Sequence, residues 1–381
     1  MKIVFVSNYF NHHQKPVADA MSALTGGQYH FIATTPVPQV RQALGYGTEY
    51  PSYVVPAFAD AHLLELARQL IDEADVVIAG AAPESLLRGR IREGKLIFRY
   101  SERPLKDGCS IVKYLPRLVK WHLRSPMWKP IYMLCASAYT APDYAKFGLF
   151  RSRCYKWGYF PEAKRYENIN GLMDQKEPAS ILWVARYLQL KHPEHAIEVA
   201  ARLRDAGYHF NMYFIGQGPM EDAMRDQVAR EQLEACVHLL GTMKPEDVRA
   251  YMEKAGIFLF TSDQNEGWGA VMNESMNSGC AVVGSRAIGS VPYLIRDGQN
   301  GLTYAPGDVD GLYEQVKNLL DHPEEQRRMG MEAYHTITEK WNAETAAERF
   351  LELSRRILAG EKHPDLYEDG PGSRHEAVKK N

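Results

Sequence analysis

Two glutamates eight residues apart, Glu266 and Glu274, lie in a stretch whose surroundings are typical of a binding site. The apolar run 256–261 before them predicts a buried parallel strand. Gly279 and the apolar run 280–284 after them predict a helix end and the next strand. Glu266 is therefore expected in the loop at the carboxyl end of a strand and Glu274 on the following helix. Open α/β sheets bind ligands in the crevice at that edge.

The spacing of the two glutamates argues against an acid and a base that act on one bond. In a mostly helical segment, eight residues span about 12 Å along the axis, which is too far for such a pair. The spacing instead suits a grip on two ends of one extended polar ligand. Gly267 and Gly269 would let backbone N–H groups approach that ligand between the carboxylates. A single glutamate would more simply be a surface residue, but the flanking glycines and strands favour a site.

Two cations follow another predicted strand. Arg186 and Lys191 come directly after the apolar run 180–185. Permanent positive charges at that position suit a diphosphate, which Arg can bind with two parallel hydrogen bonds. Each cation alone could be a solvated loop charge, but together with the two glutamates the set predicts a pocket for a nucleotide diphosphate-sugar. Gly216 and Gly218 lack the third glycine of a dinucleotide-binding loop, so they do not indicate NAD.

No metal or other cofactor is predicted. Asp308 and Asp310 have the D-x-D spacing of metal-dependent transferases, but residues 306–308 open a helical pattern, and we predict that Asp308 caps it. The five cysteines are scattered and lack C-x-x-C spacing, which indicates neither a disulfide framework nor a zinc site.

Short apolar strands alternate with helices in two separate series, which predicts an α/β fold of two Rossmann-like, doubly wound domains facing across a cleft. The expected strands are 3–7, 29–33, 76–80, 96–100, 131–136, 180–185, 210–215, 237–240, 256–261, 280–284 and 301–304. The expected divisions are a first domain over 1–165, a linker over 166–178, a nucleotide-sugar domain over 179–340, a helix over 341–360 and a disordered tail over 361–381.

Positive charge is concentrated in the first half of the chain. Residues 1–170 contain 22 Lys and Arg against 14 Asp and Glu, and the remainder contains 23 against 33, which suggests an anionic partner for the first half. Residues 105–129 combine cations, apolar residues and two tryptophans, as in an amphipathic segment at an anionic lipid surface. A solvated face of a packed helix is the alternative. No RNA-binding motif is present, so no nucleic-acid partner is predicted.

The first predicted strand leads into a polar loop with Asn11, His12 and His13, in which Asn11 is a plausible N-cap. Such a loop before a helix can hold an anion, although it could also be a simple polar turn. No run approaches 18 apolar residues, and residues 1–7 form a strand rather than a signal peptide. We therefore expect a cytoplasmic protein, with peripheral contact to the inner membrane face through 105–129.

The stretch 265–276 resembles the E-x7-E segment of retaining GT-B glycosyltransferases of family four. In that family the first Glu contacts the donor sugar and the second binds the nucleotide ribose, which implies these roles for Glu266 and Glu274. Arg186 and Lys191 stand where the family has its diphosphate-binding Arg and Lys. The resemblance covers most of the chain and is strongest over 180–310. It implies catalytic roles for Arg186, Lys191 and Glu266, and donor-binding roles for Gly216, Gly218, Thr242, Gly267, Trp268, Gly269 and Glu274.

The chain departs from the family pattern at several positions. Ala185 and His192 replace the glycines that usually flank the Arg and the Lys, and Tyr293 stands where Glu is common. The first loop lacks the family's paired glycines, and Ser101-Glu102-Arg103 occupies the region of its usual catalytic His. The acceptor-side candidates are therefore Asn11, His12, His13, Glu102 and Arg103.

The resulting hypothesis is a metal-independent, retaining glycosyltransferase. It would move a sugar from a nucleotide diphosphate-sugar to a hydroxyl of a glycan, polyprenol-linked or otherwise lipid-linked, in cell-surface polysaccharide synthesis. The resemblance also implies that the last helix crosses back to the first domain. Three alternatives stay open: a nucleotide-sugar epimerase, a non-catalytic binding protein of the same architecture, and a transferase that uses a small soluble acceptor.

Overall fold

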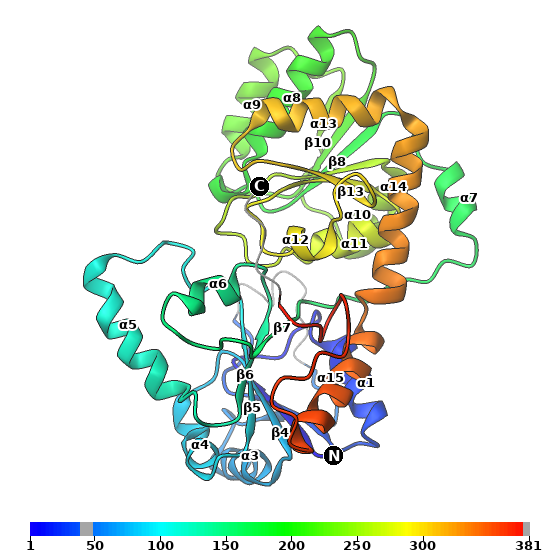
Figure 1. The fold of residues 1–381 in the computed structure, drawn as a ribbon. Coiled ribbons are helices and arrows are strands. Elements are labelled where there is room, and N and C mark those ends of the chain that lie inside the picture. Colours follow the sequence, from blue (N-terminus) through cyan, green and yellow to red (C-terminus); the bar gives the residue numbers. More distant parts are fainter. Residues whose placement is uncertain (39–48, 376–381) are drawn as a thin grey trace. The chain divides into compact units, whose positions relative to one another are not determined.

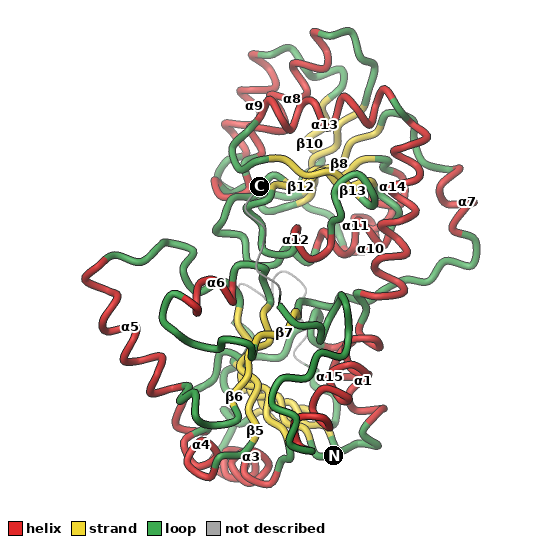
Figure 2. The backbone as a smooth tube through the Cα atoms, viewed as in Figure 1, coloured by secondary structure: helices red, strands yellow, loops and turns green. Residues whose placement is uncertain are grey.

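The computed structural model describes residues 1–38 and 49–375 and divides the chain into two compact units (Figure 1). Unit 1 contains Met1–Glu162 and Asn342–Asn381, and unit 2 contains Ala163–Trp341. Each unit has one parallel sheet with helices packed against it (Figure 2). Among the described residues, no helix combines the length and apolar character needed to cross a bilayer.

The sheet of unit 1 has seven parallel strands in the order β3-β2-β1-β4-β5-β6-β7. Its strands are β1 (Ile3–Ser7), β2 (Tyr29–Ala33), β3 (Val54–Pro56), β4 (Val76–Ala79), β5 (Leu96–Ser101), β6 (Ile131–Cys135) and β7 (Cys154–Lys156). In register, Phe5 pairs with Phe31 on one side and with Ile78 on the other. The chain order reverses between β1 and β4, so loops that follow these strands meet at a switch point.

The helices of unit 1 cover both faces of this sheet. They are α1 (Lys15–Leu24), α3 (Ala61–Glu73), η1 (Glu84–Leu86), α4 (Arg88–Glu93), α5 (Ile111–Arg124), α6 (Thr140–Ala145) and α15 (Ala343–Leu358). The last helix, α15, packs beside α1 (Figure 1). Its Phe350 ring lies 5.0 Å from the Phe98 ring of β5. The prediction that the last helix returns to the first domain is therefore confirmed.

The sheet of unit 2 has six parallel strands in the order β10-β9-β8-β11-β12-β13. Its strands are β8 (Ser180–Val184), β9 (Asn211–Ile215), β10 (Val237–Leu239), β11 (Ile257–Phe260), β12 (Ala281–Ser285) and β13 (Gly301–Tyr304). They are almost continuously apolar because helices cover both faces of the sheet. Helices α8 (Pro193–Asp205), α9 (Glu221–Arg230) and α13 (Val309–Asp321) lie on one face (Figure 1). Helices α10 (Pro245–Lys254) and α11 (Val271–Asn277) lie on the other.

The other helices of unit 2 are α7 (Ile169–Asp174), η2 (Gln189–Lys191), α12 (Val291–Leu294), α14 (Pro323–His335) and the π-helix η3 (Thr336–Lys340). The predicted cap of α13 is confirmed, because the Asp308 carboxylate accepts a hydrogen bond from Gly311 N at 2.9 Å. Asp310 instead pairs with Arg202 at 2.6 Å.

Three sequence-based expectations need correction. The tail is ordered over 361–375, where Lys156 N donates to Ser373 O at 2.8 Å and Ser373 is buried, so disorder was the wrong prediction there; residues 376–381 lie outside the described residues. The segment 166–178 contains α7 and belongs to unit 2, which begins at Ala163. Helix α1 begins at Lys15 with Gln14 as its N-cap, so the predicted cap at Asn11 is wrong.

Asn11 instead closes the turn before α1. Its side-chain oxygen accepts hydrogen bonds from His13 N at 3.0 Å and Gln14 N at 3.2 Å. The sequence pattern placed the cap too early because the Asn side chain accepts hydrogen bonds from following backbone N–H groups both in a turn and at a helix N-cap.

Candidate functional site

Lys191 and Glu266 meet at the carboxyl edge of the unit 2 sheet. Lys191 ends η2 after β8, and Glu266 lies in the loop after β11, the strand next to β8. Lys191 Nζ forms an ion pair with Glu266 Oε2, and both side chains are only 13% exposed. Ser262 Oγ donates to the same carboxylate oxygen at 3.1 Å. The chain order reverses between β8 and β11, so the pair lies at the switch point where such sheets bind ligands.

Hydrogen bonds between the two loops fix this arrangement. The Trp183 indole donates to Thr261 Oγ1 at 2.8 Å, and Thr261 Oγ1 donates to Lys191 O at 2.6 Å. Asp263 N also donates to Leu190 O at 2.9 Å. The backbone of the Lys191 loop is thus held on the loop that carries Glu266.

Arg186 lies in the loop after β8, and its position depends on Gly216 and Gly218. A Cβ on Gly216 would lie 1.9 Å from Ala185 O, and a Cβ on Gly218 would lie 2.4 Å from Tyr187 O. Both glycines therefore allow close packing of the loop after β9 against the Arg186 loop. The Arg186 side chain is exposed and has no ion-pair partner among the described residues. Thr242, after β10, is also exposed at this edge of the sheet.

The loop between Glu266 and α11 is anchored from inside the protein. Trp268 is fully buried, and its indole N–H donates to Asn273 Oδ1 at 2.8 Å. Gly269 has φ +74°, and a Cβ there would lie 2.2 Å from the Phe260 ring, so only glycine fits. The Trp268 indole therefore has no exposed surface for a ligand. Gly267 is also buried.

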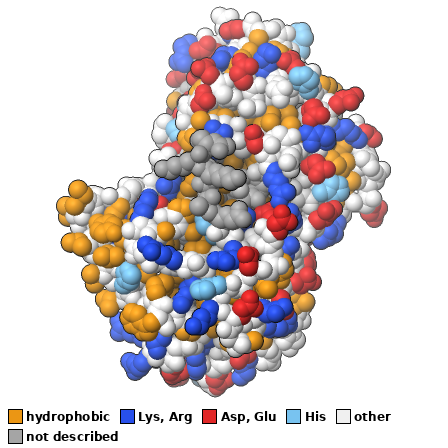
Figure 3. Space-filling model, viewed as in Figure 1, with side chains coloured by type: hydrophobic (Ala, Val, Ile, Leu, Met, Phe, Trp, Pro, Cys, Tyr) orange, Lys and Arg blue, Asp and Glu red, His pale blue; other side chains and the backbone are white. Residues whose placement is uncertain are grey.

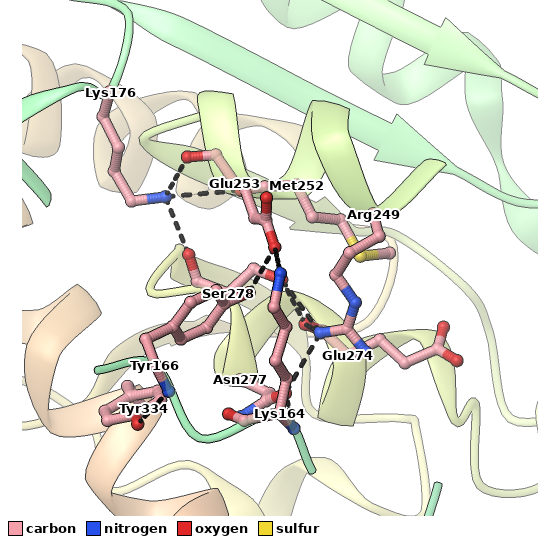
Figure 4. Close-up of polar contacts among 10 residues, drawn as sticks. All are labelled: Lys164, Tyr166, Lys176, Arg249, Met252, Glu253, Glu274, Asn277, Ser278 and Tyr334. Atoms are coloured by element: carbon pink, nitrogen blue, oxygen red, sulfur yellow. Dashed lines mark hydrogen bonds and ion pairs between the residues drawn. The ribbon is translucent and has the colours of Figure 1, made fainter. Parts of the chain in front are cut away.

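Glu274 lies on α11 with its carboxylate directed away from a polar cluster that holds the end of this helix (Figure 4). Arg249 Nη1 donates to Glu274 O, Asn277 Oδ1 and Ser278 Oγ, each at 3.1 Å. Burial raises the pKa of the Glu274 carboxyl above its ordinary value, and the positive charge of Arg249 opposes this shift.

A half-buried lysine joins this cluster to the end of α10. The Lys176 ammonium donates to Ala255 O at 2.7 Å and to Ser278 O at 2.9 Å, and to two further carbonyls of α10 (Figure 4). A cation at the carboxyl ends of two helices is stabilised by both helix dipoles. The sequence around Lys176 gave no signal of this role, because the segment has the polar composition of a linker.

Unit 1 contains a pocket of about 430 Å³ at the carboxyl edge of its own sheet. Asn11 and Glu102, two of the predicted acceptor-side residues, line it. Arg103 is engaged elsewhere, since its Nε lies 3.2 Å from the buried carboxylate of Asp143. His12 and His13 are not among the lining residues; their rings lie 3.8 Å apart.

The charged wall of this pocket was not predicted. Arg99, within β5, forms two hydrogen bonds with Glu84, at 3.0 and 2.9 Å. Arg124, at the end of α5, lies 3.6 Å from the same carboxylate. The sequence signal that could have identified Arg99 as a site residue is its charge within an otherwise largely apolar strand. Elsewhere in the lining, the Tyr159 hydroxyl donates to Glu102 Oε1 at 2.6 Å, and burial raises the pKa of this phenol.

The described residues also contain one compact group of metal-ligating side chains. His192, Glu194 and His195 bring their ligand atoms within 4.8 Å of one another, directly after Lys191.

Residues 165–336 match the family described as glycosyl transferases group 1. The glycogen synthase of Mycobacterium tuberculosis is 27% identical over 187 residues, which cover 49% of this chain and 45% of the relative. The amylovoran biosynthesis glycosyltransferase AmsK of Erwinia amylovora is 28% identical over 186 residues, or 48% of this chain and 46% of the relative. The chain thus spans about half the length of these curated relatives.

Solved structures match nearly the whole chain. The structure of Anabaena HepE in complex with UDP has a TM-score of 0.68 at 14% identity and covers 92% of this chain and 99% of that chain. Sucrose-phosphate synthase from Thermosynechococcus elongatus has a TM-score of 0.65 at 14% identity, with 94% and 99% covered. The predicted GT-B fold, with two Rossmann-like parallel-sheet domains, is therefore confirmed.

Proposed function

We propose that this chain, whose residues 165–336 match the group 1 glycosyl transferases, transfers a sugar from a nucleotide diphosphate-sugar to a hydroxyl of a glycan in polysaccharide synthesis. The observation that carries the proposal is the Lys191–Glu266 pair at the switch point of the unit 2 sheet. The polysaccharide role is supported by the relative named for amylovoran biosynthesis. The nucleotide-sugar donor is supported by the UDP complex of the HepE structure.

The donor diphosphate would bind to Arg186 and Lys191. Arg186 is exposed without an ion-pair partner among the described residues and can receive the diphosphate directly. Lys191 is held beside Glu266 and would exchange part of this contact for a phosphate oxygen when the donor binds. As the glycosidic bond breaks, negative charge grows on the leaving diphosphate, and two fixed cations stabilise that charge.

The two glutamates would hold the ends of the donor. Glu266 would accept hydrogen bonds from sugar hydroxyls, and the half-buried Glu274 would accept from the ribose. Backbone N–H groups over 267–269 would approach the donor between them. We propose that transfer proceeds with retention, without an obligatory enzyme nucleophile and without a metal or other cofactor. The buried Trp268 takes a structural part in this scheme by fixing the loop.

The acceptor would bind in the pocket of unit 1. Asn8, Asn11, Gln14 and Glu102 offer amide and carboxylate groups for sugar hydroxyls, and Tyr100 and Tyr159 add aromatic surface. A polar pocket in unit 1, separate from the Lys191–Glu266 pair of unit 2, favours a transferase over an epimerase, because an epimerase needs no acceptor.

Helix α5 supports a lipid-linked acceptor and peripheral membrane contact. Large apolar side chains on it and just beyond it are exposed, with 92% for Ile111, 66% for Leu115, 76% for Leu123 and 81% for Trp128. Figure 3 shows hydrophobic side chains gathered where α5 lies. Lys113, Lys120 and Arg124 are interleaved with them, which suits an anionic membrane surface.

A thermal-shift screen with UDP-, GDP- and ADP-sugars tests the donor proposal. One nucleotide sugar should raise the melting temperature and should be hydrolysed slowly in the absence of acceptor. A screen in which no nucleotide sugar binds at millimolar concentration would refute the proposed function.

A further inference from the structure

His192, Glu194 and His195 form a compact group at the start of α8. His192 Nδ1 lies 2.7 Å from Glu194 Oε1, and His195 Nε2 lies 3.9 Å from the same oxygen. The two imidazole rings stack with centroids 4.7 Å apart and an angle of 9° between their planes. All three side chains are only 20–30% exposed. Two imidazoles and one carboxylate therefore converge on one partly enclosed point.

Two further observations point to a ligand at this position. The second carboxylate oxygen, Glu194 Oε2, is buried and has no hydrogen-bond partner among the described residues, which is unfavourable for a charged oxygen unless another group satisfies it. His192 Nε2 lies 3.4 Å from Asp263 Oδ2. A carboxylate beside Nε2 favours the tautomer that keeps its proton there. Nδ1, which now contacts Glu194 Oε1 at 2.7 Å, can then give up its proton and bind a metal that lies between the two groups.

We propose that His192, Glu194 and His195 bind a divalent transition metal ion of the zinc class, with Asp263 as the group that orients His192. Two His and one carboxylate are typical zinc ligands, whereas Mg²⁺ and Ca²⁺ prefer oxygen ligands only. At metal bonds of about 2.1 Å, tetrahedral ligand atoms lie about 3.4 Å apart, so the three ligand atoms, now within 4.8 Å, close by small side-chain rotations.

The metal has a positioning role in this proposal and takes no part in sugar transfer. His192 directly follows Lys191, and Asp263 O accepts a hydrogen bond from Glu266 N at 3.1 Å. A metal that fixes His192 against Asp263 would therefore rigidify the junction between the loops that carry Lys191 and Glu266. The site itself does not depend on which donor the protein uses.

The test is isothermal titration of Zn²⁺, and separately of Mg²⁺, into the tag-free, chelator-treated full-length chain. We expect one Zn²⁺ per chain, no comparable Mg²⁺ binding, and a melting temperature that rises with Zn²⁺. His195→Ala should weaken Zn²⁺ binding at least about tenfold and remove the thermal shift. His192→Asn is the second variant, because the φ of +48° at His192 is tolerated by Asn.

Two further variants test whether Zn²⁺ binding is specific to this site. His209→Ala removes an exposed histidine of the same unit and should leave Zn²⁺ binding unchanged. Asp263→Asn should weaken binding about tenfold if the carboxylate orients His192, and unchanged affinity would remove Asp263 from the proposal. Equal Zn²⁺ affinity of the wild type, His195→Ala and His192→Asn, or no Zn²⁺ binding by the folded wild type, would overturn the site.

Discussion

The Lys191 ammonium pairs with the Glu266 carboxylate where the chain order of the unit 2 sheet reverses, between β8 and β11. The two residues are 75 positions apart in the sequence. Because the charges neutralise each other, both side chains can remain nearly buried before a ligand arrives. In the proposed function, the donor diphosphate would then take over the cation while the carboxylate turns to sugar hydroxyls.

Loss of either predicted diphosphate-binding cation should slow sugar transfer. We expect Arg186→Ala and Lys191→Ala each to lower kcat by about 10²-fold or more, because each removes charge stabilisation of the leaving diphosphate. Steady-state kinetics with the donor found by the screen measures this. Arg202→Ala, which removes a surface cation paired with Asp310, should leave kcat within about twofold. Near-normal turnover of Arg186→Ala would exclude Arg186 from the site.

Glu274→Gln should weaken donor binding and stabilise the protein. In the proposed function, Glu274 accepts a charged hydrogen bond from the ribose, and such a bond is worth about 1.5–3 kcal/mol. We therefore expect the donor Kd to rise about 10-fold or more in calorimetric titrations. The folded-state pKa of Glu274 is raised by burial. Wild-type stability therefore falls as pH rises from the ordinary Glu value of 4.5 through the folded-state pKa.

The difference in melting temperature between Glu274→Gln and the wild type is the control for this variant. Glu274→Gln should melt at a higher temperature than the wild type at pH 7, and the two melting curves should converge below about pH 4, where the carboxyl is protonated in both states. Lower stability of Glu274→Gln at pH 7, together with unchanged donor affinity, would contradict the assigned role.

Gly216→Ala should displace the Arg186 loop. The added Cβ would lie 1.9 Å from Ala185 O, so the two loops must separate. Gly207→Ala is the matched control, since Gly207 has φ +83° but no atom within 4 Å of the new Cβ. We expect Gly207→Ala to cost about 1–2 kcal/mol of unfolding free energy and Gly216→Ala to cost more, with loss of donor binding. Urea unfolding measures both free energies of unfolding. An equal loss of stability in the two variants would contradict the close packing of Gly216 against Ala185.

The exposed face of α5 should bind anionic vesicles. We expect the wild type to co-float with phosphatidylglycerol vesicles at low salt, less so at high salt, and not with phosphatidylcholine vesicles. The double variant Leu115→Ser and Leu123→Ser should reduce binding at least about tenfold, since each buried leucine contributes about 1.5–3 kcal/mol. Leu24→Ser removes an exposed leucine of α1 and should have no effect. Equal binding of all three proteins would refute the membrane contact.

Tyr159→Phe tests the acceptor pocket. The variant removes the hydroxyl that donates to Glu102 at 2.6 Å and should raise the acceptor KM several-fold, because Glu102 loses its orienting partner. Slow donor hydrolysis without acceptor should be unchanged. A parallel loss of donor hydrolysis would show that the effect does not arise from acceptor binding.

The local pattern of the sequence was enough to predict the strands that lie between helices. Parallel strands buried on both faces are continuously apolar, so β8, β11 and β12 could be located, and the polar residues after them, Lys191 and Glu266, could be placed at the carboxyl edge. The cap at Asp308 was also predictable from local sequence, because its hydrogen bond from Gly311 N spans only three residues.

Features that depend on distant contacts were not predictable in this way. The strands β3 and β7 have three residues each, and their local sequences, Val-Val-Pro and Cys-Tyr-Lys, do not form an apolar run that would mark a strand. Lys176 is held by Ser278 O, 102 residues away, so its polar segment resembled a linker. The pairing of Arg99 with Glu84 became visible only in the folded unit.

The sequence by itself determined which residue types stand at the strand ends, because strand and helix periods are set by neighbours a few residues away. Only the tertiary structure decided which of these side chains turn inward. Trp268 was predicted to contact the donor but is fully buried, whereas the apolar residues of α5 are exposed. Periodicity identifies the faces of a helix or loop segment, but burial depends on packing partners that other parts of the chain supply.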